Sequence, residues 1–140
     1  MKKLIPFLEK RLEIKNTTFL EKDIILHRIL LRLMHTRFKD EYAFKGGTCL
    51  TKCYLGYYRF SEDLDFTYIN QKEFHNMSQK SMRKVLSEKI NEVIGYLTSI
   101  ATELDLDFEP DKSDSRYVML GGSNKFVTFK LWYRSYREEK

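Results

Sequence analysis

Cysteine and proline are scarce in this sequence, since each occurs only twice in 140 residues. Two cysteines cannot form the disulfide framework of a small secreted protein, and two prolines exclude a proline-rich linker. At the N-terminus the apolar run Leu4–Leu8 stops at Glu9, which is too short for a signal peptide or a membrane span. We therefore expect a cytoplasmic protein with reduced thiols.

The sequence also has no strong bias of charge. Its 25 Lys and Arg against 20 Asp and Glu give a formal net charge of +5. That excess favours a polyanionic partner through long-range attraction, although scattered basic residues also describe an ordinary solvated surface. The contents of 42% hydrophobic and 32% charged residues are typical of a soluble globular protein. The length predicts a single domain over residues 1–140.

Apolar residues recur at helical spacing in two long segments. They predict amphipathic helices over Phe19–Thr36 and Ser78–Thr102. Thr18 followed by Glu21 forms a capping-box pattern, which marks the beginning of the first helix. A shorter helix is expected over Lys3–Glu13.

Short β-strand patterns lie between and after these helices. The expected strands are Tyr42–Phe44, Asp63–Ile69, Leu104–Glu109, Tyr117–Leu120 and Lys125–Tyr133. A helix over Thr48–Leu55 is expected between the first two strands, and Gly121–Asn124 has the composition of a hairpin turn. The order of elements predicts an α/β fold.

Two adjacent glycines, Gly46 and Gly47, stand where the first strand meets this short helix. Because they lack Cβ atoms, a phosphate could approach the backbone closely and meet the N–H groups and positive dipole of the helix. Thr48 would add a hydroxyl. The same pattern also occurs as a purely structural turn, so both interpretations stay open.

Asp63 and Asp65 form a second candidate site. Two residues apart on a strand, their carboxylates would project from one face, roughly 6 to 7 Å apart. Two like charges are favourable there if a cation lies between them, and carboxylate oxygens suit Mg²⁺ or Mn²⁺ bridging to phosphates. An exposed polar strand face is the alternative. The single helix and turn that link the glycines to the aspartates favour a metal-dependent phosphate site.

Two motifs in this region resemble a known family. Lys45–Lys52 reads Lys-Gly-Gly-Thr-x-Leu-x-Lys, and Arg59–Phe66 reads Arg-Phe-Ser-Glu-Asp-Leu-Asp-Phe. Together with Glu21–Asp23, they resemble the AbiEii nucleotidyltransferases, which are toxins of type IV toxin–antitoxin systems. The resemblance covers roughly Phe19 to Phe66 and continues only as an order of elements. It implies a minimal DNA polymerase β-like nucleotidyltransferase fold, with a mixed sheet flanked by helices.

The resemblance also implies roles for individual residues. Asp63 and Asp65 would bind the catalytic Mg²⁺ or Mn²⁺. The residues expected at the phosphates of an NTP are Gly46, Gly47, Thr48, Arg59 and Ser61. For Arg59 a surface salt bridge is the alternative role. Family members transfer a nucleotide to an acceptor, so we expect RNA such as tRNA ahead of a protein acceptor, an antitoxin encoded nearby, and no membrane partner.

The sequence departs from the family pattern in two respects. Enzymes of this fold usually add a third carboxylate from a neighbouring strand, but Lys125–Tyr133 contains none. Asp105, Asp107 or Glu109 could substitute, and Lys130 could instead contact a phosphate. Family members also generally carry a helical C-terminal region that we expect this chain to lack. The alternative function is therefore a catalytically impaired or truncated module that binds nucleotide or a partner.

Overall fold

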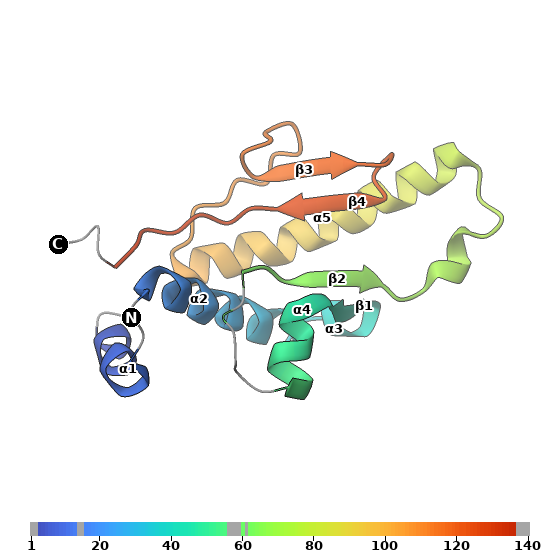
Figure 1. Cartoon of the computed structure of the whole chain (residues 1–140). Helices are drawn as coiled ribbons and strands as arrows, with labels where there is room; N and C mark the ends of the chain where they lie inside the picture. Colours follow the sequence, from blue (N-terminus) through green and yellow to red (C-terminus); the bar gives the residue numbers. More distant parts are fainter. Residues whose placement is uncertain (1–2, 14–15, 56–59, 61, 137–140) are drawn as a thin grey trace. The chain divides into compact units, whose positions relative to one another are not determined.

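The computed structural model describes residues 3–13, 16–55, 60 and 62–136, and the chain forms two compact units. The first is built from the described part of Met1–Ile69 and Arg134–Lys140, and the second from Asn70–Tyr133 (Figure 1). Each unit combines helices with a two-stranded antiparallel sheet, so the α/β class is confirmed. The expected single mixed sheet is not what the described residues form, because each four-residue strand pairs within its own unit.

The first unit begins with helices. These are α1 (Leu4–Leu12), α2 (Thr17–Leu33) and α3 (Phe38–Glu41). The N-cap of α2 is Asn16, whose side-chain oxygen accepts a hydrogen bond from the Thr18 N–H at 3.2 Å. The predicted capping box is therefore wrong. Glu21 is fully buried, and its carboxylate accepts the backbone N–H of Tyr136 at 3.2 and 3.3 Å.

Strands β1 (Tyr42–Lys45) and β2 (Asp65–Tyr68) form the sheet of the first unit. The register pairs Tyr42 with Tyr68, Ala43 with Thr67, Phe44 with Phe66 and Lys45 with Asp65. The first strand is confirmed and extends one residue further than expected. The second is shorter than predicted, because Asp63 and Leu64 precede it and Ile69 follows it.

Aromatic pairs across the two strands fix this register. The ring centroids of Tyr42 and Tyr68 lie 5.5 Å apart, and those of Phe44 and Phe66 lie 5.2 Å apart. Cross-strand pairs of this kind contribute roughly 0.2–1 kcal/mol each. A slip by one residue would turn every side chain of a strand to the other face, so these contacts would be lost.

The chain then continues directly into helix. α4 (Gly46–Cys49) runs into the π-helix η1 (Leu50–Leu55), so the helix expected from Thr48 begins at the glycines themselves. Within it the Thr51 hydroxyl donates to the Gly47 carbonyl at 2.9 Å. Cys49 and Cys53 are free thiols, and Cys53 is exposed.

The second unit is built on one long helix. Its elements are η2 (Gln71–Phe74), α5 (Gln79–Leu104), β3 (Val118–Gly121) and β4 (Phe126–Phe129). Ser78 caps α5 by accepting the Ser81 N–H at 3.2 Å, so the predicted helix is confirmed. The β3–β4 hairpin is confirmed too, with Gly122, Ser123 and Asn124 at positive φ in its turn.

The strand expected over Leu104–Glu109 is wrong. Leu104 is still the last residue of α5, and Asp105 ends the helix in a left-handed conformation with φ of 56°. Only one residue of the segment pairs as in a sheet, through the bridge of Asp107 with Trp132.

Candidate functional site

The turn between β1 and α4 lies directly against Asp65. Gly46 has a φ of +79°, a left-handed conformation that side chains disfavour. A Cβ at this position would lie 3.2 Å from the Cβ and Cγ of Asp65, and its closest contact would be the carboxylate oxygen Oδ2. The register supports this contact, because it pairs Asp65 with Lys45, the residue before Gly46. The structure therefore brings together the glycine turn and one of the two predicted metal ligands.

At the start of α4, the backbone of the glycines is accessible to a ligand, whereas the Thr48 side chain is not. Gly46 is exposed and Gly47 half-buried, whereas Thr48 is buried at 2% exposure. The N-cap position belongs to Lys45, whose side chain has no acceptor for the first N–H groups of the helix. Those groups carry partial positive charge, and the exposed Lys45 adds a full one. The turn suits an anion.

Asp63 and Asp65 are both exposed, while Leu64 and Phe66 are half-buried. The predicted alternation of polar and apolar residues is thus present, although only Asp65 belongs to β2. Mg²⁺ in proteins is commonly held by one or two carboxylates together with phosphates and water. Two exposed aspartates, one of them against a turn without a Cβ, fit that ligand set.

Among the residues that the structure describes, no third carboxylate completes a metal-binding group with this pair. In that part of the chain no group of three or more His, Cys, Asp and Glu side chains could hold a metal ion. Of the suggested substitutes, Asp107 accepts hydrogen bonds from the Tyr117 hydroxyl at 2.8 Å and from Arg116 at 2.9 Å. These two donors lower the pKa of Asp107 within the second unit.

The other predicted phosphate contacts are Arg59, Ser61 and Lys130. Arg59 and Ser61 fall outside the described residues. Lys130 belongs to the second unit, where its ammonium donates to the Ser115 carbonyl at 3.4 Å. Their roles at a nucleotide stay predictions.

A buried ion pair, which the sequence did not predict, joins the last residues of two of the family-like motifs. Lys52 Nζ lies 3.1 Å from Asp23 Oδ1, and the two side chains are only 5% and 9% exposed. The contact joins α2 to η1, the continuation of the helix that begins at Gly46. Asp23 and Lys52 both belong to the motifs that resemble the family, but the motifs alone do not indicate that their side chains pair.

Replacing Gly46 by Ala tests the close approach of the turn to Asp65. We expect Gly46→Ala to lower the free energy of unfolding by about 1–3 kcal/mol, because the left-handed φ becomes strained and Asp65 must move. Urea denaturation measures the change. Gly95→Ala is the matched control, since a Cβ there meets nothing within 4 Å and should stabilise α5 by up to about 1 kcal/mol. Equal stability of Gly46→Ala and the wild type would contradict the predicted strain.

Comparison of the sequence with known proteins identifies a family. Residues 28–136 match the family model described as nucleotidyl transferase AbiEii toxin, type IV TA system. The search of curated proteins and the search of solved structures gave no match. Within the described residues, none of the helices has the length and apolar character needed to cross a membrane. Because the family match covers well over half of the sequence, the chain belongs to the AbiEii nucleotidyltransferases, the toxins of type IV toxin–antitoxin systems.

Proposed function

We propose that this chain transfers a nucleotide from an NTP to an RNA acceptor, with Mg²⁺ or Mn²⁺ as cofactor. The observation that carries the proposal is the contact between the Gly46 turn and Asp65. It brings the backbone at the start of α4, which would bind an anion in this proposal, next to an exposed carboxylate. Phosphate and carboxylate repel each other, so this neighbourhood is favourable when a divalent cation joins them.

In this proposal the residues of the chain bind and orient the NTP. The backbone N–H groups at the start of α4 would bind phosphate oxygens, and the absent Cβ of Gly46 leaves room for the Asp65 carboxylate beside this turn. Asp63 and Asp65 would hold the cation. When bound, a divalent ion supplies charge stabilisation for the attacking and leaving oxygens of the transfer.

The reaction needs no nucleophile from the protein. An acceptor hydroxyl of the RNA forms a bond to the α-phosphorus, and the bond from that phosphorus to the oxygen of the β-phosphate breaks. Pyrophosphate leaves with the bonding electrons, and the hydroxyl proton passes to solvent. Positioning and electrostatic stabilisation by the site would account for most of the rate.

An RNA acceptor is supported by the net charge of +5, which attracts a polyanion. The toxin–antitoxin family also supports a cognate antitoxin as partner and a cytoplasmic location. A protein acceptor is the second possibility for the transfer.

A noncatalytic nucleotide-binding module is the second candidate function. It is favoured by the lack of a three-residue acidic cluster among the described residues. Calorimetry with NTP and Mg²⁺ separates the candidates when combined with a transfer assay. Metal-dependent binding without turnover supports the module, whereas turnover rejects it.

The transfer assay uses each α-labelled NTP with total tRNA and either Mg²⁺ or Mn²⁺. We expect at least one NTP to label the RNA and chelation of the metal to abolish labelling. No labelled RNA with any NTP under either metal would refute the proposed activity on tRNA.

A further inference from the structure

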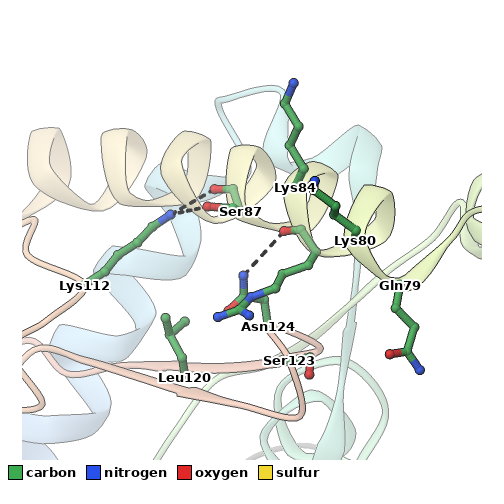
Figure 2. A pocket seen from close by; sticks show the side chains of 9 residues that line it. Gln79, Lys80, Lys84, Ser87, Lys112, Leu120, Ser123 and Asn124 are labelled. Atoms are coloured by element: carbon green, nitrogen blue, oxygen red, sulfur yellow. Dashed lines mark hydrogen bonds between the residues drawn. The ribbon is translucent and has the colours of Figure 1, made fainter.

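The second unit contains a basic groove that shares no residue with the Gly46 site. It has a volume of about 650 Å³ and is formed by the first turns of α5, Lys112, and the β3–β4 hairpin (Figure 2). Nine residues line it. Four of them are cations, Lys80, Arg83, Lys84 and Lys112, and no lining residue carries a carboxylate.

Three of the cations share one face of α5. Lys80, Arg83 and Lys84 stand at i, i+3 and i+4 and are exposed. Like charges at this spacing disfavour an isolated helix, and an anion bound over them would remove that repulsion. The N-terminus of the helix at Ser78 adds the positive end of its dipole at the same end of the groove.

Hydrogen bonds connect the opposite sides of the groove. Lys112 Nζ donates to the carbonyl of Ser87 at 3.1 Å and to its hydroxyl at 2.9 Å. At the hairpin turn, Asn124 Nδ2 donates to the Arg83 carbonyl at 3.4 Å. Figure 2 shows both connections, which bring the loop and the hairpin to α5 and so shape the groove.

We propose that this groove binds the phosphodiester backbone of the acceptor RNA, an inference that rests on the proposed function. Cations spread along one helix face suit a polymer with repeated charges. Leu120 is the one apolar residue in the lining, whereas protein interfaces have an apolar core. The lining has no aromatic ring on which a base could stack, so contacts to phosphates are favoured over contacts to bases.

Direct RNA binding tests this groove. The variant carries Lys80→Gln, Arg83→Gln and Lys84→Gln, which are exposed positions where glutamine keeps a good helix former. The control carries three substitutions of the same type at exposed positions of the first unit, Lys10→Gln, Arg11→Gln and Lys39→Gln. Both lose three positive charges. Fluorescence anisotropy with labelled tRNA measures Kd between about 50 and 200 mM salt.

The groove variant should bind tRNA on the order of 100-fold more weakly at 0.1 M salt, because each neutralised phosphate contributes roughly fivefold to eightfold there. The slope of log K against log salt should fall in magnitude by about 2 to 3. The control should stay close to the wild type. If both variants lose the same amount of tRNA affinity, the loss reflects the lower net charge and not the groove, and the inference is overturned.

Three further outcomes separate this inference from others. If tRNA affinity is unchanged but a polyglutamate peptide no longer binds, the groove takes an acidic protein segment and the inference fails. If the groove variant loses tRNA affinity although the wild type transfers no nucleotide, the inference stands and the proposed activity fails. If the groove variant binds tRNA and transfers nucleotide to it as well as the wild type does, the inference about the groove fails and the proposed activity stands.

Discussion

Asp65→Asn should lower nucleotide transfer roughly 10³-fold. The amide keeps the size of the side chain against Gly46 but removes the charge that would hold a divalent cation. Such a cation stabilises the transition state by several kcal/mol, and each 1.36 kcal/mol of lost stabilisation lowers the rate about tenfold. Because Asp65 is exposed, the free energy of unfolding should change by less than about 0.5 kcal/mol. The measurement is kcat for transfer from labelled NTP to tRNA.

Asp63→Asn should give a comparable loss, since both carboxylates are proposed as metal ligands. Asp40→Asn is the matched control, because Asp40 is another exposed aspartate of the first unit that has no proposed role. It should retain the wild-type rate. Full activity of Asp63→Asn and Asp65→Asn would show that the two carboxylates have no part in catalysis.

Lys52→Met should lower the free energy of unfolding by about 3–5 kcal/mol. It removes one partner of an ion pair whose side chains are 5% and 9% exposed, and breaking buried pairs of this kind carries a penalty of that size. Guanidinium denaturation measures the change. The double variant Asp23→Leu with Lys52→Met should recover most of the stability, because apolar residues often replace a buried pair without loss.

The same variants distinguish a structural role of Lys52 from a catalytic one. If the role of Lys52 is structural, the Lys52→Met protein should transfer nucleotide at the normal rate at temperatures where it is still folded. A Lys52→Met protein that is as stable as the wild type but inactive would contradict the structural role and place the ammonium in the reaction.

Local sequence patterns predicted the elements that local interactions determine. The periodicity of α5 and its Ser78 cap lie within one segment, so the helix could be located from the sequence. The neighbourhood of Gly46 and Asp65 could be anticipated because one helix and one turn join them. Alternation over Leu104–Glu109 was misleading, since a strand also needs a partner and α5 extends to the first residue of that segment.

Features that depend on distant residues could not be read in this way. The burial of Asp23 is compensated by Lys52, and that of Glu21 by the backbone of Tyr136. Neither contact has a periodic signal in the sequence. The choice of strand partners is likewise tertiary, so two separate sheets form where one mixed sheet was expected.

A crystal structure with NTP and Mn²⁺ bound tests most directly whether the Gly46 turn and the two aspartates form the catalytic site. We predict an anomalous manganese peak about 2.1 Å from a carboxylate oxygen of Asp65, with Asp63 as a second ligand. Phosphate oxygens should contact the backbone N–H groups at the start of α4. An ordered triphosphate and metal bound elsewhere on the chain, with Gly46 and Asp65 untouched, would contradict the proposed site.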